Sequence, residues 1–318
     1  MTKNKLVIVG AGHVGSAVLN CALSFNLADE IAVIDIIDEK ARGEALDASH
    51  GTPFPYSTNV NIHAGDFAEC KAANVIIIAA GPSIIPGETM DRLILADRNV
   101  KVMKDVMTSI TQYTRDAVII MITNPLDVMA YYAGNFFDYP KNKIFGTGTT
   151  LETARFKRMI ANKYHVDPKD VQGYMLGEHG NSAFPAWSLL NIAGVPSDRL
   201  DEYFQPEEPL DREKIGSAVI NVAYDVLNFK GFTSAGIAMA ACRLAKAVLY
   251  NEHSILPVST TIEGEYGLYD VALSLPCLIT GDGVARRIEV PLAEDEIFQL
   301  KNSAKSISNV LRSVGLVL

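Results

Sequence analysis

The segment that most restricts the fold is a glycine-rich turn close to the N-terminus. Gly10, Gly12 and Gly15 directly follow a short apolar run. The first glycine permits a tight turn, the second lets another molecule approach the backbone, and the third allows close packing between a strand and a helix. The segment therefore predicts a strand, a turn and a helix that begins at Val14. Its glycines also argue against a signal-peptide core and against a membrane span.

Short β-rich runs alternate with longer amphipathic stretches through the first half of the chain. Residues 14–25 and 92–113 have apolar side chains at helical spacing. Strands that alternate with helices imply right-handed βαβ units and a parallel sheet covered on both faces, which is the doubly wound Rossmann arrangement. The expected strands are residues 6–9, 31–35, 60–63, 75–79, 118–122 and 143–145.

The pattern changes beyond about Gly146. A helix is expected from Leu151, and antiparallel strands follow later, separated by glycine-containing turns. We therefore expect two closely packed domains, a Rossmann domain at residues 1–146 and an α+β substrate domain at residues 147–318. The further expected elements are helices at residues 212–227 and 234–250, turns at 263–267 and 281–283, and a C-terminal helix.

Composition limits the classes of partner. The chain has 318 residues, of which 48% are hydrophobic and 20% charged, and this is typical of a soluble globular protein. A net charge of −9 argues against nucleic acid and against an anionic membrane as partners, because both require basic surface. The four cysteines are scattered without metal-ligand spacing, so we expect buried thiols, no metal and a cytoplasmic protein.

An aspartate at the end of the second expected strand makes the glycine-rich turn informative about its ligand. Asp35 lies twenty positions after Gly15, where a carboxylate accepts hydrogen bonds from the ribose of a bound dinucleotide. It would repel the extra phosphate of NADP, and the neighbouring Ile36 and Ile37 provide no arginine to bind that phosphate. We therefore predict NAD as the cofactor.

Several further motifs occur in a fixed order along the rest of the chain. They are NPLD at residues 124–127, GTGTTLETAR at 146–155, GEHGNS at 177–182, KGFTS at 230–234 and LPC at 275–277. In this order the set resembles the L-lactate/malate dehydrogenase family across essentially the whole chain. The resemblance implies hydride transfer between NAD and a small 2-oxo or 2-hydroxy acid.

The resemblance assigns His179 as the group that donates and accepts the proton. Imidazolium suits this role near neutral pH, and the neighbouring Gly177 and Gly180 leave room for a ligand beside the ring. The family has an aspartate at the position of Glu152, which orients the histidine and stabilises its protonated form. Glutamate keeps the charge but adds a methylene group, so the carboxylate must be placed differently.

The resemblance also implies four residues that bind substrate and cofactor. Arg155 would bind the substrate carboxylate through two parallel hydrogen bonds. Asn124 would contact both the nicotinamide ribose and the substrate oxygen, and Thr233 would line the substrate pocket. Ile237 would form the apolar wall beside the nicotinamide.

Residues 81–92 match the loop that closes over substrate in this family and brings an arginine to the carbonyl. Alignment without a gap places Met90 at that position, and methionine cannot polarise a carbonyl. An insertion of two residues instead makes Arg92 the catalytic arginine, with Arg98 as the alternative. Ile84 would contact the substrate side chain, and burying a second carboxylate against it would be costly, so malate is not expected.

Three hypotheses follow. The first is an L-lactate dehydrogenase that acts on lactate and pyruvate as a homotetramer or homodimer. The second, within the same class, is an L-2-hydroxyisocaproate dehydrogenase that acts on larger apolar 2-oxo acids. The third is an inactive NAD-binding sensor, for which the exchange at Glu152 would be a sign of lost function.

Overall fold

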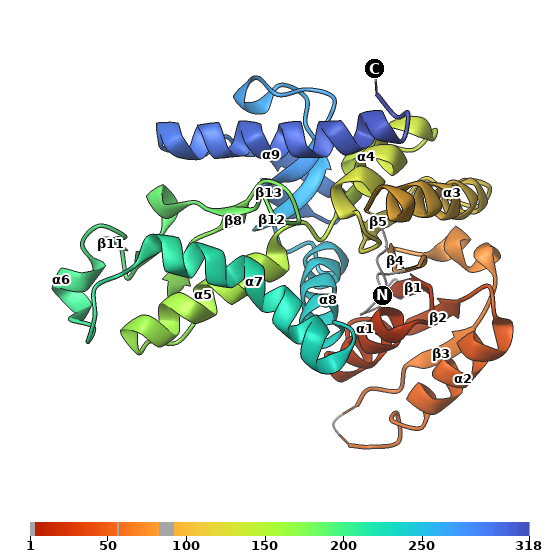
Figure 1. Ribbon diagram of the computed structural model, residues 1–318. Helices are drawn as coiled ribbons and strands as arrows, with labels where there is room; N and C mark the ends of the chain where they lie inside the picture. Colours follow the sequence, from red (N-terminus) through yellow and green to blue (C-terminus); the bar gives the residue numbers. More distant parts are fainter. Residues whose placement is uncertain (1–3, 56, 83–91, 318) are drawn as a thin grey trace.

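The computed structural model describes residues 4–55, 57–82 and 92–317, and their arrangement is shown in Figure 1. Six parallel strands form the larger part of the main sheet, in the order β6-β5-β4-β1-β2-β3 with β3 at the edge. This is the doubly wound order expected from the sequence. The strands are β1 (Lys5–Val9), β2 (Glu30–Ile34), β3 (Asn61–Ala64), β4 (Val75–Ile78), β5 (Val118–Met121) and β6 (Ile144–Gly146).

Helices cover both faces of this sheet, so its central strands are almost wholly apolar. Every residue of β1, β4 and β5 is buried, as expected for parallel strands packed on both sides. In Figure 1, α3, α4 and α9 lie above the sheet, and α1, α2 and α8 lie below it. Their bounds are α1 (His13–Ser24), α2 (Asp38–Ser49), α3 (Arg92–Thr111), α4 (Leu126–Phe136), α8 (Ala235–Leu249) and α9 (Glu294–Ser313).

Three antiparallel strands extend the same sheet beyond β6. Their bounds are β12 (Ser254–Thr261), β13 (Ala272–Thr280) and β14 (Gly283–Arg287). The junction is a single register pair between Ser259 of β12 and Gly146 of β6. The main sheet therefore crosses the boundary that we predicted between residues 146 and 147. Continuous strand pairing joins the two parts, and the main core includes residues of both. The boundary between two domains therefore stays a prediction.

The remaining elements form a smaller layer beside the main sheet. A second buried cluster contains Phe156, Val171 and Leu200, which come from α5, β7 and α6. Among the described residues, no helix is both long and apolar enough to cross a membrane. The bounds are α5 (Thr150–Tyr164), α6 (Leu200–Phe204), α7 (Arg212–Lys230), β7 (Val171–Gln172), β8 (Met175–Leu176), β9 (Phe184–Pro185), β10 (Asn191–Ile192) and β11 (Val195–Pro196).

In the glycine-rich turn between β1 and α1, two glycines lie very close to other backbone atoms. Gly10 has a φ of +103°, and a Cβ atom there would lie 2.7 Å from the backbone nitrogen of Ala80. A Cβ atom on Gly15 would overlap the carbonyl oxygen of Gly10. Gly12 differs, because a Cβ atom on it would meet nothing within 4 Å. Two of the glycines are thus required by packing, and the third leaves the backbone open on its outer side.

We expect Gly15→Ala to destabilise the protein, because the added methyl group overlaps a backbone oxygen that cannot rotate away. Overpacking of this kind costs about 1–3 kcal/mol and lowers the melting temperature measured by circular dichroism. Gly43→Ala in α2 is the matched control, since a Cβ atom there meets nothing, and it should raise stability by up to about 1 kcal/mol. Equal melting temperatures for the two variants would contradict this account of the turn.

Candidate active site

The glycine-rich turn and Asp35 form one hydrogen-bonded unit at the carboxyl ends of β1 and β2. The Asp35 carboxylate accepts hydrogen bonds from the backbone nitrogens of Ala11 at 2.7 Å and Ile37 at 3.0 Å. Asp35 therefore fixes the conformation of the turn. The ribose contact predicted for the same carboxylate stays a prediction. Each of its oxygens retains a lone pair for such a contact.

The start of α1 is suited to phosphate groups. Its cap residue is Gly12, the described residues provide no side-chain cap, and the first turn carries no acid. The first backbone N–H groups of the helix are therefore available, with the positive end of the helix dipole beside them. The open side of Gly12 gives a pyrophosphate access to them, so the residues present fit the predicted dinucleotide. Val14, in the same turn, is half-buried.

The structure brings three of the predicted residues together in the second half of the chain. His179 follows β8, and its Nδ1 lies 3.1 Å from Oε1 of Glu152 in the first turn of α5. Arg155, one turn further along α5, places a guanidinium nitrogen 3.5 Å from the same oxygen. Glu152 is only 6% exposed. The longer side chain that the sequence left unplaced thus reaches the histidine directly.

The contact between His179 and Glu152 is an ion pair rather than an aligned hydrogen bond. Neither Nδ1 of His179 nor Oε2 of Glu152 has a hydrogen-bond partner among the described residues. Glu152 is buried and His179 is partly buried, so solvent screens their attraction less than at an exposed site. The energy of this ion pair therefore depends on a protonated His179 and an ionised Glu152.

The surrounding charges keep His179 protonated. Burial alone would lower its pKa, but the carboxylates of Glu152 and Asp127 outweigh burial and raise the pKa to about 9. The pKa of Glu152 is lowered, because His179 and Arg155 offset the burial that would raise it. At neutral pH the site therefore holds an imidazolium with a proton available for transfer.

Asp127 is a residue of this site to which the sequence analysis assigned no role. It is 3% exposed, and its carboxylate accepts hydrogen bonds from the backbone nitrogen of His179 at 2.7 Å and from Ser259 Oγ at 2.6 Å. Burial raises its pKa to about 7, although both hydrogen bonds act in the opposite direction. In the sequence it resembles an ordinary acid in the first turn of a helix, so no local signal distinguishes it.

The loop that carries His179 is also attached to β13 and α9. Gly177 exchanges two backbone hydrogen bonds with Ser274, at 3.1 and 2.9 Å. On the other side, Ser303 Oγ accepts a hydrogen bond from the backbone nitrogen of Glu178 and donates one to the carbonyl oxygen of Ser182. The sequence analysis missed both serines, because each lies about a hundred residues or more from the loop along the chain.

The other predicted residues lie after β5 and at the start of α8. Asn124 follows β5, its side chain is exposed, and its carbonyl oxygen accepts a hydrogen bond from Asn99 Nδ2 at 2.6 Å. Thr233 is half-buried between α7 and α8, and Ile237 is buried in the first turn of α8. These placements are compatible with the roles predicted for them, which stay predictions.

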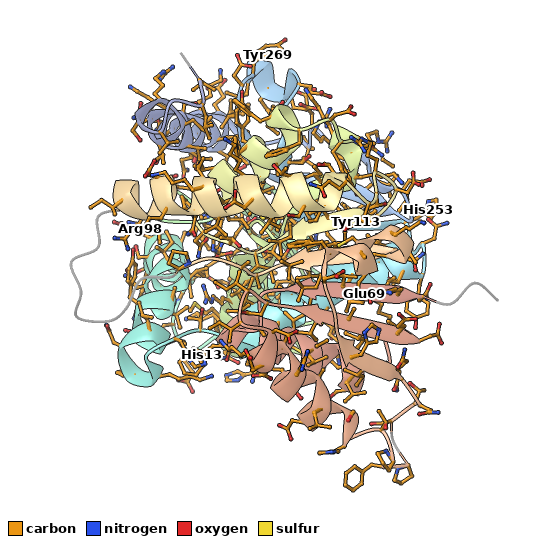
Figure 2. All side chains as sticks on the ribbon, turned by 90° about the vertical axis from the view of Figure 1, so that its right-hand side faces the viewer. His13, Glu69, Arg98, Tyr113, His253 and Tyr269 are labelled. Atoms are coloured by element: carbon orange, nitrogen blue, oxygen red, sulfur yellow. The ribbon has the colours of Figure 1, made fainter. Side chains whose placement is uncertain are left out.

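Part of the predicted substrate loop cannot be compared with the structure. Ile84 lies outside the described residues, and Arg92 is the first residue of α3, with a side chain that is not described. Arg98, the alternative catalytic arginine, is exposed on α3 and is labelled in Figure 2. The predictions for Ile84 and Arg92 therefore stay open.

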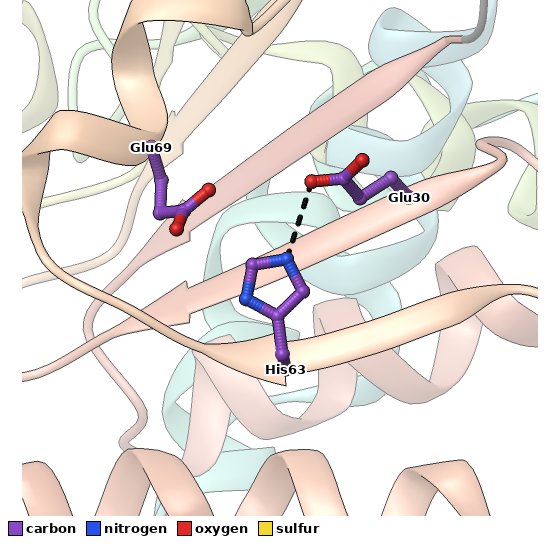
Figure 3. A group of neighbouring side chains, drawn as sticks. All are labelled: Glu30, His63 and Glu69. Carbon is purple, nitrogen blue, oxygen red and sulfur yellow. Dashed lines mark hydrogen bonds and ion pairs between the residues drawn. The ribbon is translucent and has the colours of Figure 1, made fainter.

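One side-chain cluster elsewhere has the composition of a metal site. Among the described residues, only Glu30, His63 and Glu69 lie close enough together to share an ion (Figure 3). Lys5 already provides a cation there, with its Nζ 2.7 Å from Glu30 and 2.5 Å from Glu69. Burial would lower the pKa of Lys5, but hydrogen bonds to both carboxylates raise it. The cluster is thus an ion-pair network in which the ammonium of Lys5 lies between two carboxylates.

Both halves of the chain match models of known protein families. Residues 4–146 match the lactate/malate dehydrogenase NAD binding domain, and residues 149–315 match the lactate/malate dehydrogenase alpha/beta C-terminal domain. The chain belongs to the lactate/malate dehydrogenase family. This confirms the family and the fold class that we predicted from the motifs, and the match to an NAD binding domain supports the choice of NAD.

Individual members of the family are similar over their full length. L-lactate dehydrogenase 2 of Clostridium acetobutylicum is 54% identical over 98% of both chains, and L-lactate dehydrogenase of Selenomonas ruminantium is 54% identical over 99% of both. The solved structure of minor L-lactate dehydrogenase from Enterococcus mundtii has a TM-score of 0.94 at 35% identity, covering 100% of both chains. A lactate dehydrogenase from a deep-sea metagenome library has the same TM-score at 34% identity, covering 99% of both.

We expect Glu152→Gln to lower the pKa of His179, because the substitution removes the nearest negative charge while preserving size. The wild-type ring should titrate near pH 9, and the variant ring at clearly lower pH, in NMR spectra of histidine-labelled protein. Glu39→Gln, at an exposed site on α2, should leave the titration unchanged. If Glu152→Gln also leaves it unchanged, Glu152 is not the group that holds the proton on His179.

Proposed function

We propose that this protein is an L-lactate dehydrogenase that catalyses NAD-dependent hydride transfer between L-lactate and pyruvate. The observation that carries the proposal is the group of His179, Glu152 and Arg155, which combines a proton donor with a binding site for a carboxylate. The relatives named L-lactate dehydrogenase that are 54% identical over nearly the whole chain support it.

The reaction needs two electrons and two hydrogens. NAD supplies the hydride chemistry when bound, held by the turn at residues 10–15 and by Asp35. In the direction of reduction, the carbonyl carbon of pyruvate accepts the hydride while His179 donates its proton to the carbonyl oxygen, which gives the hydroxyl group of lactate. In the reverse direction His179 accepts the hydroxyl proton as the hydride leaves.

Three residues prepare His179 and the substrate for this step. Glu152 stabilises the imidazolium, and Asp127 holds the backbone of His179 in place. Arg155 binds the substrate carboxylate through two parallel hydrogen bonds, which fixes the face of the carbonyl that meets the nicotinamide. Its contact with Glu152 is long at 3.5 Å, so the guanidinium is not held by a tight pair.

The inactive-sensor hypothesis loses support from the same geometry. It rested on the exchange of aspartate for glutamate at position 152 in the family pattern. In the structure the glutamate carboxylate lies within ion-pair distance of His179 and raises its pKa. The exchange therefore preserves the electrostatic function of the acid.

The finer expectations from the sequence belong to this proposal. We propose a cytoplasmic enzyme of glycolysis and fermentation that forms a homotetramer or homodimer. The described cysteines are free thiols, three of them buried, which fits a reducing compartment. Large apolar side chains at the surface, such as Phe229 at 88% exposure and Phe298 at 65%, fit an interface between subunits. Light scattering measures the assembly state.

Oxidation of NADH with three substrates tests the proposed function. We expect turnover with pyruvate, slower turnover with 2-oxoisocaproate, and little with oxaloacetate, whose second carboxylate would lie against the apolar Ile84. A preference for 2-oxoisocaproate would make the protein an L-2-hydroxyisocaproate dehydrogenase. Absence of turnover with all three substrates would exclude the proposed activity.

The two arginines of α3 allow a matched test of the substrate loop. We expect Arg92→Gln to lower kcat with pyruvate about 100-fold or more, with little change in the Kd for NADH, because a charge that polarises the carbonyl acts on the chemical step. Arg98→Gln should keep the wild-type kcat. Stopped-flow kinetics and NADH fluorescence provide the two measurements. The reverse result would move the catalytic role to Arg98.

A further inference from the structure

A stack of three side chains joins the two parts of the proposed active site. The rings of His13 and Phe232 lie face to face, with centroids 3.9 Å apart and planes 7° from parallel. The Nζ atom of Lys230 lies 4.7 Å from the centroid of the Phe232 ring and donates a hydrogen bond to Ser234 Oγ at 3.0 Å. Figure 2 labels His13 close to the ribbon of α1.

The two stacked rings come from segments with different roles. His13 is the first residue of α1 and directly follows Gly12, the open position of the cofactor turn. Phe232 directly precedes Thr233, in the short link between α7 and α8. The stack therefore connects the turn that would hold a pyrophosphate to the residue that would line the substrate pocket.

Contacts further along α1 and α8 extend this connection. The Sγ atom of Cys21 in α1 lies 3.4 Å from the Sδ atom of Met239 in α8. Beyond the two helices, the hydroxyl of Tyr250 donates a hydrogen bond to the carbonyl oxygen of Asn26 at 3.1 Å. The helices thus lie side by side with their starting ends together. The stack is the contact at that end. Gly231 and Ser234 at the two ends of the link bond to α7 and α8, whereas the described residues offer no backbone hydrogen bond to Phe232 between them.

We propose that His13 and Phe232 are positioning residues that place Thr233 for the 2-oxo acid and couple its binding to that of the cofactor. The inference rests on the proposed function. A cofactor bound at the first turn of α1 restrains the same backbone that presents His13. The stack passes this restraint to residues 230–234, so the cofactor should strengthen substrate binding, and the substrate should strengthen cofactor binding to the same degree.

Substitutions that remove either ring should act on substrate affinity more than on turnover. We expect His13→Ala and Phe232→Ala each to raise the KM for pyruvate about three- to tenfold, the range for one aromatic pair, with a smaller change in kcat. Because each substitution removes the same contact, the double variant should resemble the single ones. His13→Phe keeps a planar ring and should restore a nearly wild-type KM.

The control is His50→Ala, at the exposed histidine that directly follows α2, and it should leave KM and kcat unchanged. Unchanged KM values in both alanine variants, additive effects in the double variant, or failure of His13→Phe to restore KM would each overturn the inference while wild-type turnover persists. Loss of all turnover in the wild-type protein would instead remove the proposed function, and this inference with it.

Discussion

The ion pair between the partly buried His179 and the buried Glu152 is the interaction on which the rest of the site depends. Neither group is stable alone in a buried position, since an unpaired charge there costs several kcal/mol. Together they keep a proton on the imidazole up to a pKa of about 9. Arg155 lies near the same carboxylate oxygen, so one buried acid faces both the proton donor and the cation assigned to the substrate carboxylate.

The position of this pair is set by contacts that converge from four elements. Glu152 belongs to the first turn of α5, while His179 lies on a loop held by Asp127 of α4, Ser274 of β13 and Ser303 of α9. Asp127 is itself held by Ser259 of β12. The buried carboxylate of Asp127 adds a second negative charge that favours the imidazolium. The antiparallel strands that extend the main sheet thus do more than enlarge it, because Ser274 of β13 holds the loop directly and Ser259 of β12 holds Asp127.

The predicted cofactor site at residues 10–15 is held differently, because its structure is set mainly by close contacts between backbone atoms. Gly10 and Gly15 bring β1 and α1 into contact, and Asp35 fixes the turn between them through the backbone nitrogen of Ala11. The stacked rings of His13 and Phe232 then connect this rigid turn to the segment before α8. Cofactor and substrate would therefore bind to parts of one connected structure.

The sequence by itself determined the local features of this protein. The short β-rich runs predicted the six parallel strands to within about one residue at each end, and the glycine-rich turn with Asp35 predicted a dinucleotide fold. These signals are local because they depend on residues within a few positions of one another. The order of motifs along the chain likewise indicated the family and marked His179, Glu152 and Arg155.

Only the tertiary structure decided how distant segments meet. Asp127 and Ser259 are 132 positions apart, Glu178 and Ser303 are 125 apart, and no pattern in either segment predicts the hydrogen bond between them. The same holds for the pairing of β12 with β6, which joins two predicted domains into one sheet. Such contacts arise from the packing of whole helices and strands, so the partners of a buried charge become known only once those elements are placed.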